Sequence, residues 1–89
     1  MTKKEMVLRA QECINAMEKK SSYDATKLRL LVERYIGVRL GMTCYKASTV
    51  YLAIRNAEHS YFSNLGKQTL DMIVTAVINF SYDMEMGWK

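Results

Sequence analysis

The chain has 89 residues, of which 49% are hydrophobic, and a formal net charge of +4. A domain this small buries little more than half of its unfolded surface, so spare apolar side chains favour self-association. No stretch reaches the roughly 18 apolar residues of a membrane span, and the N-terminal MTKKEM lacks the apolar run of a secretory signal. We therefore expect a single cytoplasmic domain and no membrane partner.

Chain-breaking residues are scarce, because the sequence contains no proline and four glycines. This scarcity favours a few long helices over many short strands. The two cysteines, Cys13 and Cys44, are far apart and have neither a Cys-x-x-Cys spacing nor a Cys/His cluster beside them. We expect both to be reduced thiols, and we expect no metal site and no cofactor.

The first helix is predicted over about residues 3–20. Thr2 and Glu5 match the S/T-x-x-E capping box, in which two residues satisfy free backbone donors of the first turn. Lys19 and Lys20 fall in the expected last turn, where positive charge complements the helix dipole. Apolar residues recur at helical spacing and predict an ordinary core face: Met6, Ala10, Cys13, Ile14 and Met17.

The second helix is predicted over about residues 25–40, with Ser22 or Asp24 as its cap. Its apolar residues fall on two surfaces: Leu28, Leu31, Val32 and Tyr35 on one, and Leu30, Gly37 and Leu40 on the other. A helix that is apolar nearly all round is usually covered from two sides, so we expect this helix to be central. Gly37 would cost about 1 kcal/mol relative to Ala. Close approach of a second backbone is the usual compensation.

The third helix is predicted over about residues 44–63, after a helix-ending glycine at Gly41 and a cap at Thr43. Its inward residues are expected to be Ala47, Val50, Ile54, Ala57 and Tyr61. Its outward residues are expected to be Tyr45, Ser48, Leu52, Arg55 and His59. A strand is the local alternative, because residues 43–54 are rich in Thr, Tyr, Val and Ile. The helical spacing continues well past strand length, and we therefore prefer a helix.

The fourth helix is predicted over about residues 67–82, followed by a flexible tail over 83–89. Its polar residues form one narrow stripe, and its inward residues are expected to be Leu70, Ile73, Val74, Val77, Ile78 and Phe80. So narrow a polar stripe predicts more burial than one small domain provides, which favours a homodimer. The residues that we expect to anchor interfaces are Leu52, Val74, Ile78 and Trp88.

Positive charge is concentrated in the middle of the chain. Residues 1–24 carry five Lys or Arg against four Asp or Glu, and residues 68–89 carry one against three. Residues 25–67 carry seven against two, a net charge of +5. Such a segment attracts polyanions without sequence preference, although a solvated basic face would have the same composition.

The segment over residues 36–55, IGVRLGMTCYKASTVYLAIR, has the residue spacing of a helix-turn-helix. That motif has a small residue where its helices cross, a turn glycine four residues later, an apolar residue, a polar cap and further apolar residues. The matching residues are Ile36, Gly37, Leu40, Gly41, Met42, Thr43, Ala47 and Val50. Here the sequence resembles the helix-turn-helix DNA-binding superfamily. The run STVYLAIR, residues 48–55, also resembles the recognition helix of the bacterial replication initiator's DNA-binding domain.

The resemblance implies that the second helix of the motif lies in the major groove of duplex DNA. The residues that it implies for base reading are Thr43, Tyr45, Ser48 and Thr49. The residues that it implies for the phosphates or the nearby backbone are Arg39, Lys46, Arg55 and His59.

Two other functions fit the sequence. A small helical inhibitor or adaptor, as in phage-encoded inhibitors of host machinery, would dock through Leu52, the fourth helix and the Met/Trp tail. An RNA-binding protein would stack bases on Tyr45 and Tyr51. An enzyme is not expected, because the single histidine has no nucleophile or carboxylate at a telling spacing and no phosphate loop or paired acidic motif occurs. We predict an all-α domain of about four helices that binds nucleic acid, duplex DNA in preference to RNA.

Overall fold

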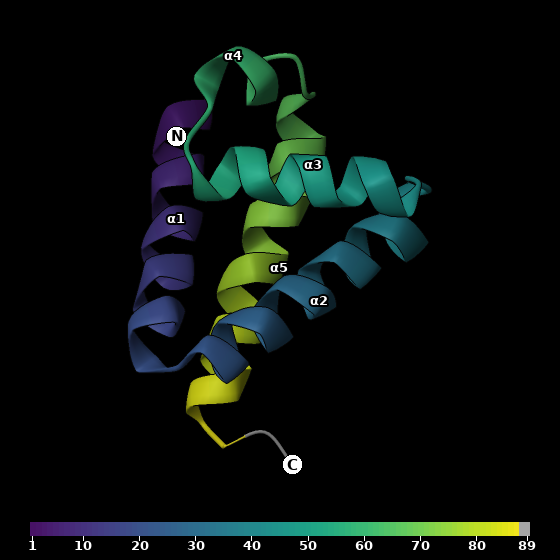
Figure 1. The fold of residues 1–89 in the computed structure, drawn as a ribbon. Helices are drawn as coiled ribbons and strands as arrows, with labels where there is room; N and C mark the ends of the chain where they lie inside the picture. The colour runs from purple at the N-terminus through teal and green to yellow at the C-terminus, as the bar shows by residue number, and fades with distance from the viewer. Residues whose placement is uncertain (88–89) are drawn as a thin grey trace.

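The computed structural model describes residues 1–87, which form five helices and no strand (Figure 1). The helices are α1 (Lys3–Lys20), α2 (Ser22–Leu40), α3 (Cys44–Arg55), α4 (His59–Phe62) and α5 (Lys67–Glu85). The all-α prediction is therefore confirmed. None of the helices in the described part of the chain has both the length and the apolar content needed to cross a bilayer.

The start of α1 has the capping box that its sequence predicts. The Thr2 hydroxyl accepts a hydrogen bond from the Glu5 N–H at 3.2 Å, and the Glu5 carboxylate accepts one from the Thr2 N–H at 2.9 Å. These hydrogen bonds, the backbone one first, lower the pKa of Glu5. Ser21 both ends α1 and caps α2, because its hydroxyl accepts from the Asp24 N–H at 2.9 Å. The second helix consequently begins three residues earlier than expected.

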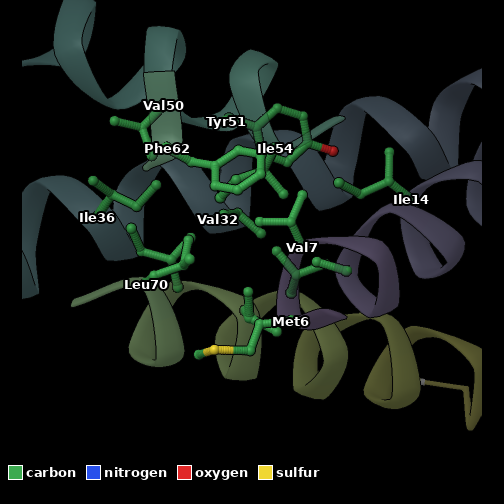
Figure 2. Close-up of a cluster of buried hydrophobic side chains, with 14 of the residues drawn as sticks. Met6, Val7, Ile14, Val32, Ile36, Val50, Tyr51, Ile54, Phe62 and Leu70 are labelled. Carbon is green, nitrogen blue, oxygen red and sulfur yellow. The ribbon is translucent and has the colours of Figure 1, made fainter. Parts of the chain in front are cut away.

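The helices enclose one hydrophobic core. Helices α1 and α5 lie side by side, α2 crosses them obliquely, and α3 runs across the end where α4 sits (Figure 1). Phe62 of α4 is 1% exposed and points into this core, which explains how a helix of four residues holds its place (Figure 2). The largest fully buried side chains are Phe62, Ile14, Met17, Leu28, Ile36, Ile54, Leu70, Ile73, Val7, Val32, Val50 and Val77.

Helix α2 is covered on one face only by the rest of the described chain. Leu28, Val32 and Ile36 are fully buried against the core, whereas Leu30 is 60% exposed and Val38 is 74% exposed. The expectation that this helix is covered from two sides is therefore wrong within residues 1–87. Of the second apolar surface predicted from the sequence, Leu30 faces outward, whereas Leu40 is half-buried against the core.

Gly37 lies beside the turn that follows α2. A Cβ added there would meet the Met42 carbonyl oxygen at 3.5 Å, which is an ordinary contact distance. The expected close approach of a second backbone at Gly37 is therefore wrong: among residues 1–87, the one neighbour of this Cβ within 4 Å outside α2 lies in the turn that directly follows the helix.

The helix expected over residues 44–63 is interrupted after Arg55. Ala57 has a left-handed backbone conformation with φ +53°. Its N–H donates to the Ile54 carbonyl at 3.1 Å, and the Glu58 N–H donates to the Ala53 carbonyl at 2.8 Å. These are the two hydrogen bonds of a Schellman motif, which ends a helix by turning the chain away from its axis. The chain then makes the separate helix α4.

The last helix continues further than expected. α5 ends at Glu85, so residues 83–85 of the expected flexible tail are helical. Met84 is half-buried and packs against the core, whereas Met86 is 69% exposed. The proposed interface residue Trp88 lies outside the described residues.

Candidate nucleic-acid interface

The connection between α2 and α3 has the form of a helix-turn-helix. α2 ends at Leu40 and is capped by Gly41, whose φ of +66° and ψ of +30° place it in the left-handed region that glycine adopts without strain. Three residues later α3 begins, and the Thr43 hydroxyl accepts a hydrogen bond from the Lys46 N–H at 3.2 Å. α3 then returns across α2 (Figure 1). Both signals that the sequence predicts for this turn are present.

The first three residues of α3 and the cap before them are exposed. The Tyr45 side chain is 83% exposed, and Thr43 and Lys46 are also exposed. Arg39 is exposed in the last turn of α2, on the other side of the turn. Four of the eight residues predicted to bind nucleic acid therefore surround one short turn and face solvent.

Two predicted base-reading hydroxyls already have partners within the chain. Arg29 donates through Nη2 to the Ser48 hydroxyl oxygen at 2.8 Å, while its Nε forms an ion pair with Glu33 at 2.7 Å. The Thr49 hydroxyl donates to the Tyr45 carbonyl oxygen at 2.9 Å. Ser48 keeps its own hydroxyl proton for a further hydrogen bond, whereas Thr49 offers only its oxygen.

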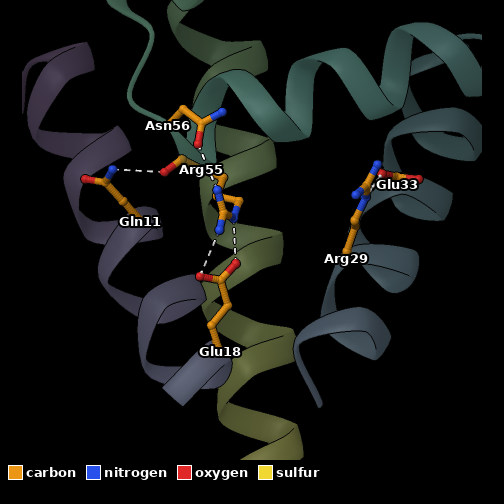
Figure 3. A network of polar contacts seen from close by, with 6 residues as sticks. All are labelled: Gln11, Glu18, Arg29, Glu33, Arg55 and Asn56. Carbon is orange, nitrogen blue, oxygen red and sulfur yellow. Dashed lines mark hydrogen bonds and ion pairs between the residues drawn. The ribbon is translucent and has the colours of Figure 1, made fainter. Parts of the chain in front are cut away.

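Arg55, which we expected to contact phosphates, binds a carboxylate of α1. Its guanidinium donates to both Glu18 carboxylate oxygens at 2.5 and 3.2 Å, and its Nη1 donates to the Asn56 side-chain oxygen at 2.9 Å (Figure 3). Gln11 of α1 donates to the Arg55 carbonyl at 2.9 Å. The hydrogen bonds that Arg55 donates to Glu18 are the main reason that the pKa of Arg55 is raised. This cation fastens the C-terminal end of α3 to α1.

His59 does not share a helix with the other predicted site residues. It is exposed at the start of α4, and its ring packs edge-on against Phe62 with centroids 5.0 Å apart. The expectation that it projects from the same helix face as Tyr45 is wrong, because the Schellman motif at Ala57 separates the two segments. Its contribution to nucleic-acid binding stays a prediction.

Leu52 and Tyr51 line a polar hollow between α1, α2 and α3. The hollow has a volume of about 260 Å³ and is also lined by Glu18, Arg29 and Arg55. Leu52 is half-buried there, so it does not project freely outward as expected. Tyr51 is 2% exposed and burial raises its pKa to about 12. The expectation that Tyr51 stacks on RNA bases is therefore wrong.

The inward position of Tyr51 could have been read from the sequence. Ala47, Val50, Tyr51 and Ile54 follow the i, i+3, i+4, i+7 spacing of a buried helix face, and all four are buried. The aromatic ring made Tyr51 a candidate for base stacking, but its spacing is that of the core.

The residues expected at a dimer interface differ in how far they are exposed to a second chain. Val74 is 4% exposed and belongs to the core of this chain, so it offers no free interface surface. Ile78 is half-buried at the edge of the core, on α5. A dimer that uses α5 would therefore have to use the outer edge of this helix.

Some of the seven cations of the middle segment are paired inside the fold, and others face solvent. Arg29 and Arg55 form ion pairs with glutamates inside the fold. Arg39 and Lys46 are exposed on either side of the turn, and no carboxylate of residues 1–87 pairs with them. Positive charge is therefore exposed on both sides of the turn, and also at Arg34 of α2 and at Lys67 in the first turn of α5. In the same described residues no three His, Cys, Asp or Glu side chains gather as a metal site would require.

Comparison of the chain with protein-family models, with curated proteins and with solved structures finds no match in any of the three.

Proposed function

We propose that the protein is a cytoplasmic nucleic-acid-binding protein that contacts duplex DNA with the N-terminal half of α3 and the turn before it. The observation that carries this proposal is the exposure of Thr43, Tyr45 and Lys46 directly after a left-handed glycine turn. In a helix-turn-helix, the N-terminal residues of the second helix are the ones that reach the base edges.

The side chains that can contact DNA have two different roles. Lys46 and Arg39 supply positive charge for phosphates on either side of the turn, which gives affinity without sequence preference. Tyr45 and the Ser48 hydroxyl would face the bases, and Ser48 would do so while held by Arg29. Arg55 is a weaker candidate for phosphate contact than Lys46, because Glu18 already neutralises it. We therefore propose strong salt dependence and modest sequence preference.

The experiment is fluorescence anisotropy with a labelled 30-base-pair duplex at 50 and 200 mM salt. We expect affinity to fall by at least tenfold between these salt concentrations, because phosphate contacts release counterions. Lys46→Glu should weaken binding at least tenfold. Lys4→Glu, which makes the same charge change at an exposed position of α1, is the matched control and should weaken it much less. Ser48→Ala should alter preference among duplex sequences more than overall affinity.

Equal weakening by Lys46→Glu and Lys4→Glu would show a non-specific effect of net charge and would contradict the proposed site. Absence of binding at 50 mM salt, with helical content intact by circular dichroism, would end the DNA proposal. We also propose a homodimer, because dimeric helix-turn-helix proteins place two such helices about 34 Å apart on the duplex. Sedimentation velocity with and without the duplex measures this directly.

RNA binding is the second candidate, and the exposure of Tyr45 favours it. A ring that is 83% exposed beside Lys46 suits stacking on an unpaired base. The same anisotropy experiment with single-stranded RNA separates the two proposals. Binding that prefers the single strand and is lost with Tyr45→Ala, but kept with Tyr45→Phe, would favour RNA over duplex DNA.

A further inference from the structure

The outward face of α2 carries a strip of apolar side chains, which we call the α2 outer strip. Tyr23 is 73% exposed, Leu30 is 60% exposed and Val38 is 74% exposed. They are spaced seven and eight residues apart, so they lie along one side of the helix. Exposed apolar residues are common singly, but a row of three large ones on one face indicates a contact surface.

Two depressions flank this strip. One, of about 460 Å³, lies between α2 and the start of α3 and includes Val38, Met42 and Cys44 in its lining. The other, of about 300 Å³, lies further along α2 and includes Tyr23 and Lys27. Leu30 and Arg34 line both, so the two depressions form one interrupted groove. Its length from Tyr23 to Val38 is about 22 Å, at about 1.5 Å per helical residue.

We propose that the α2 outer strip binds an acidic amphipathic helix of a partner protein, about four turns long. Such a helix would place apolar side chains at i, i+3, i+4 and i+7 into the two depressions. This inference does not rest on the proposed DNA contact, since it concerns the outer face of α2 and not the reading face of α3.

The charge of the strip selects an acidic partner. Arg34 is exposed between the two depressions, and Lys27 is exposed about two helical turns before it. Glu33 is the carboxylate that lines the same groove, and Arg29 neutralises it in an ion pair at 2.7 Å. The strip is therefore apolar with positive charge along its centre. Glutamates flanking the apolar face of a partner helix would complement it, and lysines would be repelled.

The same charges disfavour a second copy of this chain as the occupant. An antiparallel pair of α2 helices that matched Tyr23 to Val38 and Leu30 to Leu31 would also place Lys27 opposite Arg34, twice. A parallel pair would place each cation opposite itself. Both arrangements bring like charges together across a desolvated contact, which is unfavourable.

The probe is a fluorescein-labelled 16-residue peptide with leucine on one helical face and glutamate on the flanks. Its controls are a peptide with lysine in place of every glutamate, and one with the leucines scrambled. Anisotropy measures affinity, and ¹⁵N-labelled protein locates the contact by amide chemical-shift changes. We expect the acidic peptide to bind at least tenfold more tightly than either control. The largest shifts should fall on residues 23–44.

Two pairs of variants of the full chain test the location. Leu30→Ser should weaken the acidic peptide at least tenfold, whereas Leu8→Ser, at a 41% exposed leucine of α1, should not. Arg34→Glu should weaken the acidic peptide and strengthen the basic one, whereas Arg9→Glu on α1 should do neither. All four positions are exposed, so the fold should persist. Cys44 gives a second readout, because the bound acidic peptide should slow its alkylation by iodoacetamide.

Three results would overturn the inference. Equal binding of the acidic, basic and scrambled peptides would show non-specific adhesion. If the chain alone forms a dimer and Leu30→Ser converts it to a monomer, the α2 outer strip would be assigned to a second copy of the chain. Protection of Cys44 by duplex DNA but not by the acidic peptide would assign the groove to nucleic acid.

Discussion

The two ends of α3 have opposite surroundings. At its C-terminal end, Ile54 is 1% exposed and Arg55 is bound by Glu18. At its N-terminal end, Tyr45 and Lys46 extend into solvent. A helix of twelve residues is thus anchored at one end and presented at the other. An anchored helix loses little further freedom when it binds, which is an advantage for recognition.

The two ends of α3 show that the number of cations in a helix differs from the number that can contact a polyanion. Arg55 and Lys46 are both cations of the same short helix, and the sequence makes them equal candidates for phosphate binding. The fold gives Arg55 a carboxylate partner from a helix 37 residues earlier in the chain and gives Lys46 none within residues 1–87. A charge count along the chain therefore overestimates the positive surface that a polyanion would meet.

Truncation of one side chain at each end of α3 should give the largest difference in the free energy of unfolding. Ile54→Ala should lower the free energy of unfolding by about 2–5 kcal/mol, because it leaves a cavity in a core that cannot collapse fully. Tyr45→Ala should change it by less than about 0.5 kcal/mol, because the ring makes no core contact. Urea denaturation followed by circular dichroism measures both. Similar losses for the two variants would contradict the division of α3 into an anchored and a presented end.

The backbone turns before and after α3 should change stability in opposite directions when glycine and alanine are exchanged there. Gly41→Ala should lower stability by about 1 kcal/mol, since φ is +66° and a Cβ costs about 1–2 kcal/mol there. Ala57→Gly should raise stability by up to about 1 kcal/mol, because it removes that cost at φ +53°. Nothing lies within 4 Å of a Cβ added at Gly41, so the loss would be conformational and not a clash. Thermal unfolding of both variants tests the pair, and a loss at both sites would contradict it.

The cap of α3 tests whether the presented end is held as a helix. Thr43→Ala removes the hydroxyl that accepts from the Lys46 N–H and should cost about 1 kcal/mol. Thr43→Ser keeps the hydroxyl and serves as the control. Amide hydrogen exchange should accelerate in the first turn of α3 with Thr43→Ala and remain unchanged near Ile54. Uniform acceleration along α3 would show that the two ends are not independent.

Features with a local signal could be predicted from the sequence. The capping box of Thr2 and Glu5, the left-handed Gly41 and the Thr43 cap all depend on residues within four positions of one another, and all three are present. The helical spacing behind these caps was sufficient to predict an all-α fold. The end of α3 has no such signal, because its Schellman motif places alanine where glycine is usual.

Features that depend on distant partners could not be predicted. Ser48 is bound by Arg29 and Arg55 by Glu18, across 19 and 37 residues of sequence. The sequence placed Leu30 and Leu40 on one apolar surface of α2, but Leu40 packs against the core and Leu30 is exposed, which follows from where α1, α3 and α5 pack. Periodicity identifies which faces are apolar, and only the packing of the helices decides which of them is covered.

The ion pair at the anchored end should contribute less than the core beside it. The Arg55 and Glu18 side chains are 39% and 33% exposed, and pairs of this kind contribute less than about 1 kcal/mol. Arg55→Ala should therefore cost little stability, and less still at 1 M salt, where the pair is screened. Glu18→Gln is the companion variant, and the double-mutant cycle gives the coupling energy from urea melts. A loss of several kcal/mol would show that the pair is a main support of α3.

Tyr51→Phe should give the smallest change in the free energy of unfolding at neutral pH. It should also give the clearest change in how stability depends on pH. Its hydroxyl opens towards the polar hollow without a hydrogen-bond acceptor in the described chain, so Tyr51→Phe should alter neutral-pH stability by less than about 0.5 kcal/mol. Burial raises its pKa from 10.0 to about 12. Below pH 10 both the folded and the unfolded chain keep this proton. Between pH 10 and 12 the unfolded chain loses it first, so stability must fall as pH rises.

The test is the difference in the free energy of unfolding between the parent chain and Tyr51→Phe across this pH range. Urea melts from pH 8 to 12 should show a steeper loss for the parent chain than for Tyr51→Phe, with the two diverging above pH 10. Tyr45→Phe is the matched control, because it removes a hydroxyl from the presented end of the same helix and should follow the parent profile. Contributions from groups that the parent and the variant share cancel in the difference. Parallel profiles for the parent and Tyr51→Phe would mean that Tyr51 is not held in the core, and the anchored end of α3 would lose one of its main supports.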